Sequence, residues 1–201
     1  MIALIDYGAG NLTSVVKGFS AVGAEIRTVD TLAGLQGATG IVIPGVGHFN
    51  ATASLNDDWR LAIGRAVGNG VPLLGICLGL QWLFEGSEEA PELPGIGLMK
   101  GRCFRLSGSV KVPHVGWNTL DTGGRPSRLL EGIPAQASAY FTHSYAAPIG
   151  PDTVASTTHG VPFASAVERD LIFGAQFHPE KSGHTGLKML ENFLRVVRNG
   201  R

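Results

Sequence analysis

The chain has 201 residues, enough for one domain with a sizeable buried core. Its 16 basic and 16 acidic residues give a formal net charge of zero, which argues against binding polyanions through bulk charge, and its 44% of hydrophobic residues excludes a disordered chain. Glycine occurs 29 times, about twice its average usage, which indicates many tight turns rather than a helical bundle.

The first half of the chain alternates short apolar runs with segments long enough to form helices. The runs lie at residues 2–5, 25–29, 41–43 and 73–76. This alternation is typical of parallel strands joined by crossover helices, so the first half is predicted to be α/β.

The spacing of apolar residues predicts two of the helices. A helix is expected over residues 57–67, where the sequence Gly68-Asn-Gly follows as a C-terminal signal and one face carries Trp59, Ala62, Ile63, Ala66 and Val67. A last helix is expected over about residues 184–198. Its apolar stripe, which should pack on the sheet, consists of Leu187, Leu190, Leu194 and Val197.

From residue 101 to about residue 177 the pattern changes to short β-rich runs such as RCFRL, HVGWNTL, AYFTHSYAA and LIFGAQF, separated by turn signals. These runs predict additional antiparallel strands. No repeat, low-complexity tract or linker divides the chain, so residues 1–201 are expected to form a single domain. The predicted fold class is α/β, a three-layer α/β/α sandwich with a central, mostly parallel sheet and added antiparallel strands.

The cysteines and the N-terminus are the basis for predicting the cellular compartment of the protein. Cys77 and Cys103 are too few for a disulfide framework and lack the spacing of a zinc or redox pair, which favours a reducing compartment, the cytoplasm. The N-terminus has no basic region or cleavage site and is interpreted as a strand. The uncharged stretch 66–84 contains Pro72 and several glycines, so a buried strand and turn are expected there rather than a membrane span.

The sharpest chemical signal is the sequence Gly75-Ile-Cys-Leu-Gly79, placed where an apolar strand meets a helix-compatible segment. Small residues on both sides of a nucleophile allow the sharp turn that lifts its side chain above a sheet. A helix N-terminus there favours a thiolate and offers N–H groups to a developing oxyanion. Taken alone, a free cysteine is more often a small buried apolar side chain, so Cys77 needs a partner base.

A candidate base follows the run LIFGAQF, in the sequence Gln176-Phe-His-Pro-Glu180. Residues two apart in extended chain project to the same side, so the Glu180 carboxylate can hold one imidazole nitrogen of His178 while the other faces the thiol. Either residue alone is more often an ordinary surface residue. Together with Cys77 they form the hypothesis of a Cys-His-Glu triad.

Three other classes of site fit the sequence poorly. A dinucleotide site would use Gly8 and Gly10, with Asp30 further on, but Thr13 stands where the fingerprint has its third glycine. A phosphate-binding P-loop is excluded because no Gly-Lys pair occurs. The six histidines show no metal-ligand spacing, so no metal and no cofactor is expected.

The motifs around Cys77 and His178 resemble those of class I glutamine amidotransferases, the triad glutaminases. Further motifs resemble the glutaminase subunits of imidazole glycerol phosphate synthases, and the resemblance spans essentially the whole chain. They are Asp-Tyr-Gly-Ala-Gly-Asn at 6–11, Pro-Gly-Val-Gly-His-Phe at 44–49, Lys-Val-Pro-His-Val-Gly-Trp-Asn at 111–118, Tyr-Phe-Thr-His-Ser-Tyr at 140–145 and His-Pro-Glu-Lys-Ser at 178–182.

The resemblance implies an enzyme that hydrolyses glutamine to glutamate and ammonia. Cys77 would attack the side-chain amide, His178 would carry the proton and Glu180 would orient His178. The oxyanion would be bound by the N–H groups of Leu78 and Val46. The residues implied to surround glutamine are Gly45, Gly47, Gln81, Glu89, His143, Ser144 and Tyr145, and Glu89 would pair with the α-ammonium group.

The resemblance also implies a partner, a TIM-barrel cyclase subunit that uses the ammonia to make imidazole glycerol phosphate and AICAR in histidine biosynthesis, in a heterodimer with this chain. No nucleic acid or membrane is expected. The loop 44–47 is expected to aim a carbonyl into the oxyanion site until the partner's substrate reorients it. The residues implied at the docking face are Asn11, Trp117, Asn118, Tyr140 and Lys181.

Alternatives remain open from the residues alone. The same triad would serve a stand-alone cysteine amidohydrolase or peptidase, or the glutaminase subunit of a different synthase. A binding subunit without activity is disfavoured because all three triad residues are present. The roles of Cys103, Trp82 and His114 are undecided; His114 could lie at the interface or on the surface.

Overall fold

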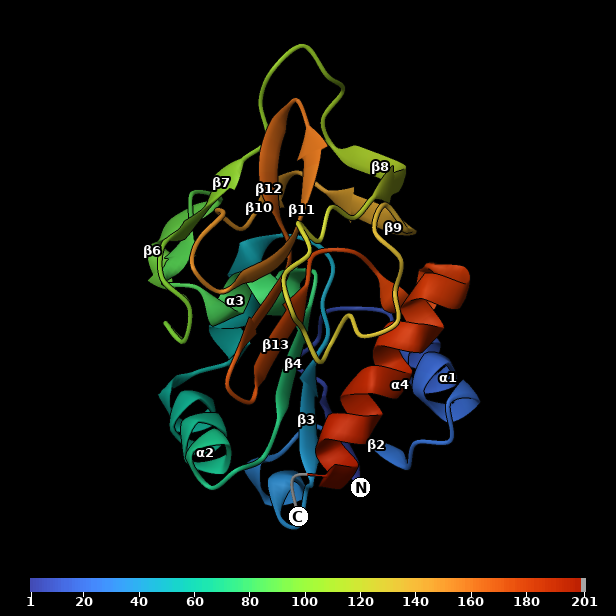
Figure 1. Ribbon diagram of the computed structural model, residues 1–201. Helices are drawn as coiled ribbons and strands as arrows, with labels where there is room; N and C mark the ends of the chain where they lie inside the picture. Colours follow the sequence, from blue (N-terminus) through green and yellow to red (C-terminus); the bar gives the residue numbers. More distant parts are fainter. Residues whose placement is uncertain (200–201) are drawn as a thin grey trace.

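A seven-stranded sheet forms the middle layer of the structure, a computed structural model that describes residues 1–199 (Figure 1). The four apolar runs of the first half form neighbouring strands of this sheet. The strand order is β11 (Thr153–His159), β12 (Val161–Arg169), β13 (Ile172–Ala175), β4 (Leu73–Ile76), β3 (Gly40–Ile43), β1 (Ile2–Ile5) and β2 (Ile26–Val29).

The five strands from β13 to β2 run parallel, and β11 and β12 are antiparallel additions at one edge. Strands β1, β3, β4 and β13 are buried along their whole length. Such strands need helices on both faces, which explains why they are continuous apolar runs rather than alternating ones.

Helices cover both faces of the sheet (Figure 1). On one face, Phe193 of α4 packs edge-to-face against Phe19 of α1 and Phe173 of β13. On the other face, Trp59 and Ile63 of α2 pack in a cluster with α3 and the strands. The prediction of a three-layer α/β/α sandwich is confirmed. The helices are α1 (Leu12–Ala21), α2 (Asp57–Gly68), α3 (Leu78–Leu83) and α4 (Gly183–Asn199), with short 3-10 turns η1 (Leu32–Leu35), η2 (Phe49–Ser54) and η3 (Pro179–Lys181).

The remaining strands lie beyond the carboxyl ends of the central strands (Figure 1). Strands β8 (His114–Thr119) and β9 (Ser138–His143) form an antiparallel pair. A four-stranded sheet has the order β10 (Tyr145–Ala146), β7 (Arg102–Arg105), β5 (Gly86–Ser87) and β6 (Ala90–Pro94).

One predicted core position is wrong. Leu190, Leu194 and Val197 of α4 are buried, but the side chain of Leu187 is 38% exposed. The first turn of α4 packs through Gly186, where an added Cβ would collide with the Pro179 carbonyl of η3, so the next residue points away from the core. Among residues 1–199, none of the helices has the length and apolar character needed to cross a membrane.

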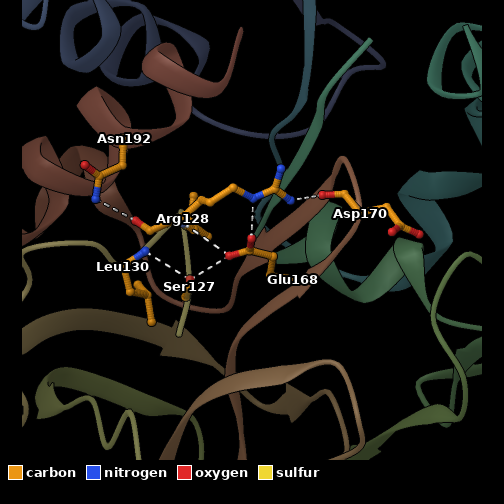
Figure 2. A network of polar contacts seen from close by, with 7 residues as sticks. Ser127, Arg128, Leu130, Glu168, Asp170 and Asn192 are labelled. Atoms are coloured by element: carbon orange, nitrogen blue, oxygen red, sulfur yellow. Dashed lines mark hydrogen bonds and ion pairs between the residues drawn. The ribbon is translucent and has the colours of Figure 1, made fainter. Parts of the chain in front are cut away.

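A network of polar contacts centred on Glu168 ties the loop between β8 and β9 to the sheet (Figure 2). The Glu168 carboxylate accepts hydrogen bonds from Arg128 Nε at 2.7 Å, Ser127 Oγ at 2.7 Å and Leu129 N at 3.3 Å. Asn192 of α4 donates to the Leu129 carbonyl at 3.0 Å. The loop also forms a β-bridge from Asp121 to Ser156 of β11, and around residues 127–130 these side chains hold it.

Glu168→Ala is expected to lower the free energy of unfolding by about 2–4 kcal/mol, because it leaves several donors without their acceptor. Urea unfolding at neutral pH measures the loss. As a control, Glu191→Ala removes an exposed carboxylate that forms a surface ion pair with Lys188, and should leave the unfolding curve close to that of the wild type. Equal stability of the two variants would contradict the role given to the network.

Candidate active site

Cys77 occupies a sharp turn between β4 and α3. Its φ of 53° lies in the left-handed region, where residues other than glycine are uncommon, and its backbone N–H donates to Ala175 O at 2.7 Å. The two flanking glycines make this turn possible: a Cβ on Gly75 would lie 2.6 Å from Gly79 O, and one on Gly79 would collide with Ile43 O. The predicted sharp strand-to-helix turn is therefore present, with Cys77 4% exposed.

Gly79→Ala is expected to destabilise the protein by about 3 kcal/mol or more, or to prevent folding, because the new methyl group meets the backbone of β3 rather than a movable side chain. Thermal unfolding compares it with Gly64→Ala, a control on the exposed face of α2 where an added Cβ meets nothing. That control should be neutral or stabilising by up to about 1 kcal/mol. A Gly79→Ala protein as stable as the wild type would contradict this account of the turn.

The structure brings His178 and Glu180 together beside this turn. His178 Nδ1 lies 2.8 Å from Glu180 Oε1, and the two side chains are 2% and 3% exposed. The His178 backbone N–H donates to Tyr140 O at 2.9 Å, which fixes the residue at the end of β13. Within residues 1–199, His178 Nε2 has no hydrogen-bond partner, so this atom is available to exchange a proton with a reacting group.

Burial by itself lowers the pKa of His178, because it penalises the charged imidazolium. The charges of Cys77 and Glu180 outweigh this effect and raise the pKa of His178 to about 10. The histidine therefore carries a proton at neutral pH whenever Cys77 is a thiolate, which is the charge state that a cysteine nucleophile needs.

A pocket of about 260 Å³ opens beside Cys77. Leu78 lines it, as do all the residues predicted to surround glutamine except Gly45: Gly47, Gln81, Glu89, His143, Ser144 and Tyr145. Val46, predicted as an oxyanion donor, and Gly45 do not line it. Pro113 and Thr142 complete the lining; the prediction did not name them, although each lies within a motif that the sequence displayed.

Hydrogen bonds fix the walls of this pocket. Gln81 Nε2 and His143 Nδ1 both donate to the Tyr145 carbonyl, at 2.8 Å and 2.9 Å. Glu89 Oε2 accepts from the backbone N–H of Phe49 at 2.7 Å, which holds this carboxylate at the pocket wall. Gln176, which the prediction left without a role, is fully buried and donates from Nε2 to Cys77 Sγ at 3.6 Å.

The loop before η2 lies against the start of α3. Leu78 N–H, a predicted oxyanion donor, bonds to the Gly45 carbonyl at 3.4 Å. Tyr7 Oη donates to the adjacent Pro44 carbonyl at 2.7 Å and so holds the loop in this arrangement. The N–H group of Leu78, predicted to bind an oxyanion, is therefore occupied by a carbonyl oxygen in this arrangement.

The residues predicted for docking gather in part on one face. The Tyr140 ring lies 6.0 Å from the Trp117 ring, and Lys181 Nζ lies 6.0 Å from the Tyr140 ring centroid. Trp117 is 58% exposed, which is unusual for so large an apolar side chain. Asn118 is only half-buried and turns towards the interior, and Asn11 caps the N-terminus of α1 by accepting from Ser14 N.

The three residues without a predicted role are all buried. His114 is 3% exposed, so it does not lie at the surface. Trp82 and Cys103 are fully buried, and Cys103 Sγ lies 3.8 Å from Gln81 O. Burial raises the pKa of the Cys103 thiol, so this cysteine is not a competing nucleophile. No group of three or more His, Cys, Asp or Glu side chains in residues 1–199 is arranged to hold a metal ion.

Solved structures share this fold. The chain superposes on a crystal structure of a glutamine amidotransferase with a TM-score of 0.77 at 17% identity, covering 98% of this chain and 100% of that one. It superposes on a chain of PurLQS from Thermotoga maritima with a TM-score of 0.75 at 18% identity, covering 96% and 97%. At these identities the likeness establishes the fold.

Sequence comparison establishes the family. The model of the family described as glutamine amidotransferase class-I matches residues 3–197. The chain is 47% identical over 201 residues to the imidazole glycerol phosphate synthase subunit HisH of Desulfitobacterium hafniense strain Y51, which covers 98% of this chain and 95% of the relative. The HisH subunit of Thermococcus kodakarensis is 48% identical over 202 residues, with 98% and 100% covered. The chain therefore belongs to the class-I glutamine amidotransferase family, alongside the HisH subunits of imidazole glycerol phosphate synthase.

Proposed function

We propose that this protein is the glutaminase subunit of an imidazole glycerol phosphate synthase, acting through a Cys77-His178-Glu180 triad. The observation that carries the proposal is a cysteine on a strained turn that lines the pocket and that interacts with His178 of a buried His-Glu pair. The relatives at 47% and 48% identity over nearly the whole chain are named as HisH subunits, which supports this synthase rather than another.

The reaction follows from the charges in the site. The Cys77 thiolate attacks the side-chain carbonyl carbon of glutamine, and the electron pair of the C=O bond moves onto oxygen. His178 gives its proton to the amide nitrogen, so the C–N bond breaks with ammonia as the leaving group and a thioester remains. Neutral His178 then takes a proton from water, which attacks the thioester and releases glutamate and the thiolate. Glu180 keeps the imidazole oriented and stabilises its positive charge.

The oxyanion must be bound by two N–H groups, and here Leu78 N–H is occupied by Gly45 O. Rotation of the Gly45–Val46 peptide would remove this carbonyl and turn the Val46 N–H towards the site. The backbone is suited to that rotation because glycines precede and follow Val46, and Gly47 has a φ of 106°. The described arrangement is then a resting state with low glutaminase activity.

Tyr7→Phe is expected to raise the glutaminase activity of the isolated chain by about 3–10-fold, because it removes one buried hydrogen bond that holds the loop in the resting arrangement. Glutamate release without any partner measures the change. The hydroxyl is the only group removed, so the ring packing is preserved. Unchanged or reduced activity in a stably folded Tyr7→Phe protein would contradict the resting state.

The partner is proposed to be a TIM-barrel cyclase subunit, docked in a heterodimer on the face that carries Trp117, Tyr140 and Lys181. An exposed tryptophan next to a tyrosine, whose ring lies 6.0 Å from a lysine ammonium group, is a suitable anchor for a protein interface. Free ammonia is mostly protonated in neutral water and is then not a nucleophile, so the product needs a shielded route to the partner. Residues 1–201 are proposed to act as a single domain. The two free thiols are consistent with the cytoplasm.

The proposed synthase is tested by adding the cyclase subunit and its ribotide substrate and measuring imidazole glycerol phosphate. Product formation should depend on glutamine and disappear with Trp117→Ala at subunit concentrations near the dissociation constant. Product formed from ammonium salts but never from glutamine would contradict the assignment to this synthase. Rapid glutamine hydrolysis without any cyclase would favour a stand-alone amidohydrolase.

A further inference from the structure

A chain of buried histidine side chains leads from strand β8 to the wall of the glutamine pocket. His114 and His143 are directly opposite each other in the β8–β9 pair, and His114 Nδ1 lies 3.1 Å from His143 Nε2. On its far side, His114 Nε2 lies 3.3 Å from Asn118 Nδ2. Both imidazoles are buried, at 3% and 7% exposure, so each of these contacts replaces a bond to water.

The direction of each hydrogen bond in the series from Asn118 to Tyr145 follows from the groups at its two ends. The Tyr145 carbonyl can only accept, so His143 Nδ1 carries the hydrogen of that 2.9 Å contact. Asn118 Oδ1 accepts from Thr119 N, and Nδ2 donates to Thr158 O, so the Asn118 amide presents a donor to His114 Nε2. His114 Nδ1 is then the donor and His143 Nε2 the acceptor, and both rings are neutral.

The surroundings keep both rings neutral. Burial lowers the pKa of His114 to about 4 and that of His143 to about 3, and neighbouring histidines add to the effect, His159 for His114 and His114 for His143. His114 is stacked between Phe141, at 4.8 Å, and His159, at 4.1 Å between ring centroids. His159 in turn donates to Lys111 O. No acidic side chain forms an ion pair with either buried ring in residues 1–199.

This series of hydrogen bonds leads to the groups that shape the pocket. His143 lines the pocket, and the Tyr145 carbonyl that it holds also accepts from Gln81 Nε2 at 2.8 Å. Gln81 Nε2 further lies 3.4 Å from Gln176 Oε1, and Gln176 Nε2 donates to Cys77 Sγ. One continuous series of hydrogen bonds thus joins Asn118, next to the exposed Trp117, to the nucleophile.

We propose that His114 is a positioning residue for glutamine binding: its Nδ1–H holds the His143 ring in the orientation that fixes the Tyr145 carbonyl and Gln81. Loss of this donor leaves His143 Nε2 as a buried acceptor without a partner, and the ring is expected to rotate towards the pocket. The effect falls on substrate binding, because His114 itself touches neither the pocket nor the reacting atoms. The inference rests on the proposed glutaminase function.

Two substitutions separate hydrogen bonding from packing. His114→Phe keeps a ring between Phe141 and His159 but has no donor, whereas His114→Asn keeps a donor near the position of Nδ1 and gives up the stack. In the complex with the cyclase subunit, His114→Phe should raise KM for glutamine about 10-fold with kcat within about 3-fold, the pattern expected when ground state and transition state lose the same contact. His114→Asn should keep KM within about 3-fold of the wild type.

Thermal unfolding of the same proteins supplies the contrast, because the loss of stacking should make His114→Asn the less stable variant. If the donor matters, His114→Phe therefore has the higher KM and His114→Asn has the lower stability. A wild-type KM in His114→Phe, or a KM that rises most in His114→Asn, would overturn the proposal.

A second readout does not depend on turnover. Modification of Cys77 by 6-diazo-5-oxo-L-norleucine, a reactive glutamine analogue, requires the pocket, whereas alkylation by iodoacetamide requires only the thiol. His114→Phe should slow the first reaction about 10-fold relative to the second. If the ratio of the analogue rate to the iodoacetamide rate is the same in His114→Phe and wild type, the role of His114 is overturned, while the proposed glutaminase function is not. A wild-type protein that neither hydrolyses glutamine nor prefers the analogue would instead overturn the proposed function.

Discussion

Cys77→Ala is expected to lower the rate of glutamine hydrolysis by at least about 10⁴-fold, because without Sγ no thioester forms and water must attack the amide directly. Stability should change little. Cysteine and alanine both carry a Cβ, so the strain of a φ of 53° is the same in the two proteins. Glutamate release in the presence of the liganded cyclase subunit measures the activity, and urea unfolding measures the stability.

Cys103→Ala is the matched control for this result. It removes the other buried thiol, which lies 3.8 Å from the Gln81 carbonyl oxygen and does not line the pocket. It should keep activity within about 3-fold of the wild type while losing about 1 kcal/mol of stability through lost packing. Residual turnover above about 1% in Cys77→Ala would show that another group acts as the nucleophile.

Glu180→Gln is expected to lower glutaminase activity by about 10²–10⁴-fold with little change in KM. The amide keeps the size of the side chain but loses the negative charge that stabilises the imidazolium, and it can present a donor to His178 Nδ1, which then favours the wrong tautomer. Steady-state kinetics at neutral pH measures the loss. Activity within about 3-fold of the wild type would contradict the role given to Glu180.

The pH dependence of stability gives a second test of the same substitution. His178 has a pKa raised from 6.5 to about 10 in the folded protein, so between these values the folded state holds more protons than the unfolded state. This contribution is fully present below about pH 6.5 and is lost as the pH rises towards about 10. Removing the Glu180 charge lowers the pKa of His178, so Glu180→Gln should lose less stability than the wild type over that range. An equal slope of the free energy of unfolding against pH in the two proteins would contradict the charge effect assigned to Glu180.

The central sheet could be predicted from sequence because its strands are buried on both faces. Continuous apolar runs identified β1, β3 and β4 within about a residue of their observed bounds. Strands β11 and β12 were not identified individually, because their sequence is rich in Thr, Ser and Ala and includes Pro162, which disfavours a central strand. Leu187 was misplaced because periodicity gives the face of a helix but not where its packing begins.

Local motifs identified the elbow cysteine and the His-x-Glu pair, because a turn and a two-residue spacing are short-range properties. The contacts that shape the pocket depend instead on pairings across the fold. Tyr7 reaches Pro44, Gln176 reaches Cys77, and His114 is buried because β8 pairs with β9 and His159 closes over it. Nothing in the local sequence distinguishes a buried histidine of this kind from one at an interface.

The protein is proposed to be a Cys77-dependent glutaminase that is held in a resting state until a partner acts on it. The most direct test of this proposal is glutamate release from glutamine by wild type and Cys77→Ala, each alone and each with the cyclase subunit and its ribotide substrate. High activity is expected only for the wild type with the liganded partner. Equal wild-type activity with and without the partner, or activity that survives in Cys77→Ala, would contradict the proposal.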